Sequence, residues 1–153
     1  MRMKIIVDVN VILSALIKNS ITRKIILNSG LVLYFPEPSL HKIRKYQNYV
    51  IKKSGMHEDE YHEILRGLFE YVRIIPTEEI QKNWTRAKAI MEHIDPEDVV
   101  FIASAMTFNS SIIWSDDKDF EKQKSVKIIK THRIGLSCFY RYSFTGITKD
   151  LSE

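Results

Sequence analysis

The chain has 153 residues, of which 44% are hydrophobic and 27% charged. This suits one globular domain that buries roughly 70% of its unfolded surface. A single cysteine, Cys138, excludes an intramolecular disulfide and a multi-cysteine zinc site. The N-terminal apolar run at 5–17 contains Asp8 and Asn10, so it indicates a buried strand leading into a helix, with no membrane-spanning segment. We therefore expect a cytoplasmic protein in a reducing compartment.

The net charge of +4 is unevenly distributed along the chain. Residues 118–149 contain eight Lys/Arg against two acids. Residues 41–53 contain no acid and five basic residues, namely Lys42, Arg44, Lys45, Lys52 and Lys53. Patches of this kind attract polyanions such as nucleic acid, although a solvated helix face has the same composition.

Short apolar segments alternate with longer helical patterns. Strands are predicted at residues 4–7, 31–35, 72–75, 111–115 and 126–130. Helices are predicted at 11–18, 22–28, 39–53, 58–71, 78–93, 97–108 and 134–142. This alternation predicts an α/β fold with a parallel sheet covered by helices on both faces.

Acidic residues follow two of the predicted strands directly. Asp8 stands where the first strand ends, and Asp116, Asp117 and Asp119 follow the strand at 111–115. In an open parallel sheet, ligands collect beyond the carboxyl ends of the strands. If the two strands are neighbours, these acids converge at one edge of the sheet.

A third acid is expected at this edge from a helix start. Asp95 suits the N-cap of the helix at 97–108, and Pro96 suits its first position. Asp98 shares the apolar stripe of that helix, so its carboxylate should be partly desolvated and need a partner. A metal ion is one such partner, and the backbone N–H groups of the first turn are the other.

A cluster of carboxylates with no histidine or cysteine nearby offers only oxygen ligands. That chemistry suits Mg²⁺ or Mn²⁺ rather than zinc. Such ions can activate a water molecule and stabilise the leaving oxygen of a phosphodiester. Mutual repulsion among the acids also favours a bound cation.

Three motifs together resemble the PIN domain. They are Asp8-Val9-Asn10 after an apolar strand, Asp95-x-x-Asp98 opening a helix that continues FIASAM, and Trp114 to Phe120, read as WSDDKDF. The order and spacing match from about residue 4 to residue 130. The nearest variant is a prokaryotic group related to the toxin nucleases of VapBC toxin–antitoxin systems.

The resemblance implies a three-layer α/β/α sandwich with a five-stranded parallel sheet over the single domain 1–153. It implies a Mg²⁺- or Mn²⁺-dependent endoribonuclease that acts on single-stranded RNA, with a possible cognate antitoxin and a homodimeric state. Catalytic and metal-binding roles fall on Asp8, Asp98 and Asp117, with Asp119 as a further metal-binding acid. Supporting roles fall on Asn10, which orients the site through hydrogen bonds, and on Ser115, Asp116 and Asp95.

One position departs from the family pattern. PIN nucleases usually carry a glutamate in the helix after the second strand, and Lys42 stands in that slot. Glu37 is five residues earlier, about 140° away around a helix, and is a poor substitute. Lys42 could weaken metal binding, contact a substrate phosphate or point to solvent.

Two other readings compete with the nuclease. A haloacid-dehalogenase-like phosphatase needs Asp-x-Asp after its first strand, whereas this chain has Asp8-Val9-Asn10. The stronger rival is a catalytically degenerate PIN domain that binds RNA or a protein without cutting, with Lys42 as its best support. Three retained acids argue against it, because without metal they would repel RNA phosphates.

Overall fold

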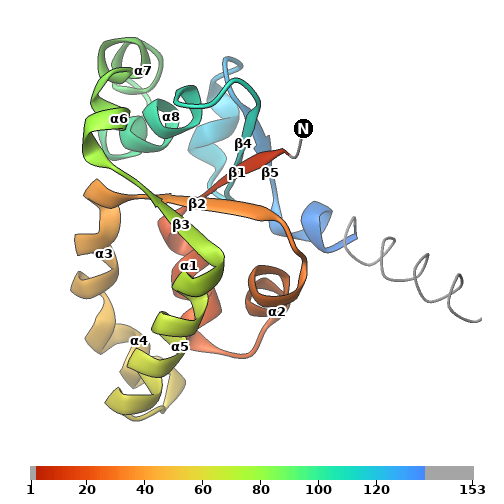
Figure 1. Cartoon of the computed structure of the whole chain (residues 1–153). Coiled ribbons are helices and arrows are strands. Elements are labelled where there is room, and N and C mark those ends of the chain that lie inside the picture. Colours follow the sequence, from red (N-terminus) through yellow and green to blue (C-terminus); the bar gives the residue numbers. More distant parts are fainter. Residues whose placement is uncertain (1–2, 137–153) are drawn as a thin grey trace, which may run out of the picture.

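The computed structural model describes residues 3–136, which form a three-layer α/β/α sandwich (Figure 1). Its middle layer is a five-stranded, all-parallel sheet in the order β3-β2-β1-β4-β5. The strands are β1 (Lys4–Val7), β2 (Val32–Pro36), β3 (Val72–Ile75), β4 (Ser111–Trp114) and β5 (Lys127–Ile129). The predicted fold class is confirmed.

The helices divide into two layers on opposite faces of the sheet (Figure 1). One face is covered by α1 (Val9–Ile17), α2 (Ile21–Asn28), α3 (Leu40–Lys45), α4 (Gln47–Ser54) and α5 (Glu58–Tyr71). The other face is covered by α6 (Thr77–Gln81), α7 (Trp84–Met91) and α8 (Val99–Met106).

The core is densest around β1 and α8. Ile6 and Val7 of β1 are fully buried, as expected for a central strand covered on both faces. In α8, every residue from Val99 to Ala105 is buried, so this helix lies between the sheet and α6–α7. The helix that begins at Asp98 is thereby anchored along its whole length.

Two of the predicted helices are each divided into two. The helix predicted at 39–53 is broken at Tyr46, and that predicted at 78–93 is broken at Asn83. Both residues have ψ near zero, at 4° and 7°, a sparsely populated backbone region that interrupts a helix. Apolar periodicity continues across each break, which explains why the pattern predicted single helices.

At the C-terminal end of the described residues, positions 131–136 are helical. The rest of the helix predicted at 134–142, together with Cys138, lies outside the described residues. Within residues 3–136, no helix has both the length and the apolar character needed to cross a membrane.

Candidate active site at the carboxyl edge of the sheet

The strand order brings the two sets of strand-end acids together. β1 pairs directly with β4, and Val7 lies opposite Trp114 in the register. The backbone N–H of Asp8 donates to the carbonyl of Trp114 at 3.0 Å. Asp8 and the acidic segment after β4 therefore leave the sheet at the same point.

Ser115 connects two of these acids. Its hydroxyl donates to Oδ2 of Asp8 at 2.7 Å and accepts from the backbone N–H of Asp117 at 3.0 Å. Ser115 itself is fully buried, so both hydrogen bonds are shielded from competing water. This serine positions the Asp8 carboxylate relative to the loop that carries Asp117.

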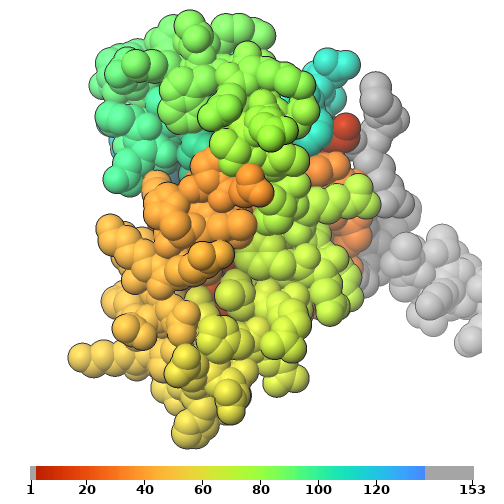
Figure 2. All heavy atoms as spheres, turned by 60° about the vertical axis from the view of Figure 1, so that its left-hand side comes forward, coloured from red at the N-terminus to blue at the C-terminus, as the bar shows by residue number. Residues whose placement is uncertain are grey.

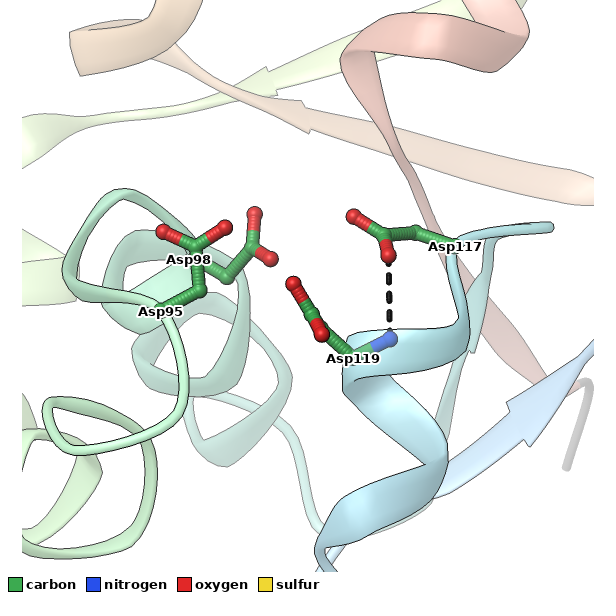
Figure 3. Close-up of side chains that lie close together, drawn as sticks. All are labelled: Asp95, Asp98, Asp117 and Asp119. Atoms are coloured by element: carbon green, nitrogen blue, oxygen red, sulfur yellow. Dashed lines mark hydrogen bonds between the residues drawn. The ribbon is translucent and has the colours of Figure 1, made fainter.

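Four aspartates form a cluster at this edge, here called the four-acid cluster. One carboxylate oxygen from each of Asp95, Asp98, Asp117 and Asp119 lies within 4.8 Å of the others. Figure 3 shows Asp95 and Asp98, from the start of α8, facing Asp117 and Asp119 across a gap. Asp117 also accepts from the backbone N–H of Asp119 at 2.9 Å (Figure 3). Two segments far apart in sequence thus present their acids to one point.

Asp98 is the most strongly perturbed acid of the cluster. It is 7% exposed, and its Oδ2 is buried without a hydrogen-bond partner among the described residues. Burial raises the pKa of Asp98 to about 8, helped by the negative charges of Asp95, Asp8 and Asp117. A buried carboxylate oxygen without a donor is costly unless a cation or proton compensates it.

Asp8 lies next to the four-acid cluster without being a member of it. It is 4% exposed, and this burial raises its pKa, while the hydrogen bond from Ser115 opposes the rise. Asp117 raises the pKa of Asp8 further and Lys42 lowers it. Asp8 therefore lies within electrostatic reach of both the cluster and the lysine.

The supporting residues Asp95 and Asp116 have different roles. Asp95 caps its helix by accepting from the backbone N–H of Glu97 at 3.0 Å, as its sequence position predicts. Asp116 accepts from the backbone N–H and hydroxyl of Thr131 at 2.9 and 2.6 Å. Both Asp116 oxygens thus tie the loop after β4 to the segment after β5. Asp116 therefore does not share the four-acid cluster.

Asn10 is exposed on the first turn of α1. Within residues 3–136 its side chain makes no hydrogen bond, so the orienting bonds expected of it are not formed there. Instead it lines an open hollow beside Asp117, together with Ser14 and Lys118. A free amide in such a hollow is placed to contact a ligand rather than a neighbouring side chain.

Lys42 extends from α3 toward the start of α8. Its Nζ lies 3.3 Å from Oε2 of Glu97, and its side chain is 21% exposed whereas that of Glu97 is 78% exposed. Glu37 accepts from the backbone N–H and hydroxyl of Thr77 at 3.2 and 2.8 Å. Glu37 thus joins the ends of β2 and β3 and does not replace the missing glutamate. The role of Glu97 as partner of Lys42 was not predicted, although its place beside Asp98 was visible in sequence.

The fold and the converging acids are those of a nuclease-type α/β domain. The family model of the PIN domain matches residues 6–138. The chain therefore belongs to the PIN domain family, whose members are generally nucleases that use divalent metal ions and act on nucleic acid. No curated protein matches the chain closely enough to count as a relative.

Proposed function

We propose that this PIN domain is a Mg²⁺- or Mn²⁺-dependent endoribonuclease that hydrolyses phosphodiester bonds of single-stranded RNA. The observation that carries the proposal is the buried, unpartnered Oδ2 of Asp98 within a cluster of three further aspartates. Such an arrangement is unfavourable for the ionised acids until a cation is bound, and without a cation Asp98 holds a proton instead.

The donor set fits a hard divalent cation. Its members are all carboxylates, and one oxygen from each lies within 4.8 Å of the others, which is close enough for a single ion to bind several of them. Asp98, Asp117 and Asp119 would hold the metal, with Asp8 beside them and Asp95 at the helix start. A bound metal supplies a more acidic water and stabilises the leaving oxygen.

The chain's own residues prepare the site for this chemistry. Ser115 holds Asp8 against the Asp117 loop through one buried and one partly buried hydrogen bond. Lys42 offers an ammonium to a substrate phosphate, because its partner Glu97 is exposed and their pairing is weak. An arriving phosphate can therefore displace Glu97 at small cost and gain a charge-assisted hydrogen bond.

The test compares Asp98, a member of the four-acid cluster, with Asp116, which adjoins the cluster in sequence but binds Thr131. Asp98→Asn removes the unpartnered carboxylate, and Asp116→Asn changes an acid that is already occupied by Thr131. We expect Asp98→Asn to lower Mn²⁺ affinity and RNA cleavage at least about 100-fold, more than a change outside the metal ligands does. Asp116→Asn should retain both. Equal behaviour of the two variants would contradict the proposal.

A second candidate function is a PIN domain that binds RNA or a protein without cutting. It is favoured by the Lys42–Glu97 pair, which places an ammonium beside the acids. Lys42→Glu would restore the family glutamate and is expected to tighten Mn²⁺ binding, measured by calorimetry. The second function would be supported if the unaltered protein cleaved none of a varied set of RNAs in Mg²⁺ or Mn²⁺ while Lys42→Glu cleaved them.

The resemblance of the sequence motifs to VapBC toxins supports a further proposal about partners and location. We propose a cytoplasmic toxin that forms a homodimer and is neutralised by a cognate antitoxin. Growth arrest on expression, relieved by Asp98→Asn and by the product of a neighbouring small reading frame, is the expected result. Light scattering of the purified protein measures the oligomeric state.

A further inference from the structure

We propose that the outer face of α3 and α4 binds single-stranded RNA and guides it to the acidic edge of the sheet. This face, here called the α3–α4 ridge, consists of Arg44, Lys45, Tyr46, Tyr49, Lys52 and Lys53. The proposal deepens the nuclease function given above and rests on it for what happens to the bound strand.

The cations of the ridge lack acidic partners. Arg44, Lys45 and Lys52 are exposed and form no ion pair within the described part of the chain. Four lysines elsewhere on the surface pair with acids at 4.0 Å or less, namely Lys82, Lys88, Lys122 and Lys130. Since residues 41–53 contain no acid, the positive potential of the ridge is not cancelled locally.

Two exposed tyrosines lie among these cations. Tyr46 is 39% exposed and Tyr49 is 53% exposed, although large aromatic side chains are usually buried. Nζ of Lys45 lies 5.7 Å from the ring centre of Tyr46, and Nζ of Lys53 lies 5.5 Å from that of Tyr49. Lys53 also donates to the Tyr49 hydroxyl at 3.1 Å. Each ring therefore has an ammonium beside it.

This pairing of ring and ammonium matches the chemistry of an unpaired nucleotide. A base stacks on an aromatic ring, and the adjacent phosphate is attracted by a cation. Bases within a duplex are already stacked on each other, so the tyrosines favour a single strand. The arrangement carries no hydrogen-bonding pattern that would read one base sequence.

The ridge is continuous with the candidate active site. Its helix α3 also carries Lys42, whose Nζ lies beside Glu97 at the start of α8. Figure 2 shows the segment of α3 and α4, coloured orange to gold, along one flank of the molecule with side chains standing out from its body. At its far end the ridge stops at Gly55, because α5 begins with the acids Glu58, Asp59 and Glu60.

A second copy of the chain is a poorer occupant of this face. A two-fold dimer through the ridge would place the same patch against itself. Four cations from each copy would then face each other, with no acid on the ridge to pair with them, and the like charges would repel. The charge pattern therefore favours a polyanion over self-association.

The experiment measures binding without cleavage. Full-length protein carrying Asp8→Asn is titrated in EDTA into a fluorescently labelled single-stranded RNA, and into the duplex of the same sequence. The test variant is Tyr46→Ala/Tyr49→Ala, and the matched control is Tyr71→Ala, which is 51% exposed on α5. We expect at least about a tenfold loss of single-strand affinity for the test variant and none for the control. Duplex affinity should change little in either.

A charge series tests the cations separately. Each phosphate contact contributes about 0.7 to the slope of log K against log salt. The triple variant Arg44→Gln/Lys45→Gln/Lys52→Gln removes three cations, so its slope should be shallower by about 2. A control triple variant at exposed positions elsewhere, Lys24→Gln/Arg86→Gln/Lys124→Gln, should leave the slope unchanged. Unaltered binding by the tyrosine variant, or equal losses in the two triple variants, would overturn the proposal.

Failure of the ridge and failure of the nuclease function give different results. If the unaltered protein binds RNA through the ridge but never cleaves it, the proposed RNA-binding face is supported and the proposed nuclease function is contradicted. If the ridge variants bind and cleave RNA as well as the unaltered protein, the nuclease function is supported and the proposed RNA-binding face is contradicted. Dissociation of a dimer on Tyr46→Ala/Tyr49→Ala, seen by light scattering, would instead assign the face to contact between copies.

Discussion

The acidic sheet edge and the α3–α4 ridge present opposite charges on neighbouring elements, and they are built in opposite ways. Asp8 and Asp98 are held inside the fold, each less than a tenth exposed, and the other acids of the four-acid cluster are partly buried. The ridge cations stand in solvent without acidic partners. Lys42 belongs to α3 but reaches the acidic side, where it contacts Glu97.

This difference separates two tasks of a nucleic-acid enzyme. Exposed cations attract a polyanion over about 10 Å or less at ordinary ionic strength, and salt weakens them. The acids repel the same polyanion until a bound metal ion offsets part of their charge. Binding and chemistry should therefore respond to different mutations and different conditions.

The largest expected effect comes from the core beneath the acidic edge. Phe120 is fully buried, and its ring meets Phe101 of α8 edge-on with 6.2 Å between ring centres. Phe120→Ala should destabilise the fold by about 3–5 kcal/mol and loosen the loop that carries Asp117 and Asp119. Chemical denaturation measures the stability. Below the melting temperature, Mn²⁺ binding should weaken while RNA binding in EDTA is kept, and loss of both together would contradict the separation.

The next effect concerns the chemistry alone. Asp8→Asn keeps an oxygen that can accept from Ser115 and removes one charge beside the cluster. We expect cleavage to fall at least about 100-fold, measured under single-turnover conditions. RNA affinity in EDTA should be unchanged or higher, because one repelling charge is gone. A parallel fall in affinity would show that the two regions are not separable.

Salt should act on the ridge and spare the chemistry. Four contacts between ridge cations and phosphates predict a slope near −3, or roughly a 50-fold loss of affinity between 50 and 200 mM salt. The cleavage rate at saturating RNA should change far less. The cleavage rate and the RNA affinity are measured over the same range of salt. A rate that falls in proportion to the affinity would contradict the separation of binding from chemistry.

A separate effect concerns the pH dependence of stability without metal. The folded-state pKa of Asp98 is raised from 3.8 to about 8, so between these values the folded chain binds the extra proton. Stability therefore falls as pH rises through this window and levels off above it. Asp98→Asn should remove part of that fall and raise the melting temperature at pH 8 by about 2–4 °C per kcal/mol regained. An unchanged pH profile would mean that Asp98 is not desolvated in solution.

Much of this molecule follows from local pattern. Alternating apolar segments predict the five strands because each buried strand needs a short continuous apolar run. Asp95-Pro96 predicts a helix start because capping and a fixed φ act within a few residues. The strand-end positions of Asp8 and Asp117 were visible for the same reason, as was the acid-free composition of residues 41–53.

The tertiary structure decided which of these features meet. Only the sheet order places β1 beside β4, and thereby brings Asp8 to Ser115 across 107 positions of sequence. Local pattern did not show where each of the three acids after β4 points: Asp116 turns to Thr131, whereas Asp117 and Asp119 lie close to Asp98. Likewise Lys42 reaches Glu97, 55 positions away. Sequence periodicity specifies which face a residue occupies, whereas the direction of a side chain depends on partners that only packing supplies.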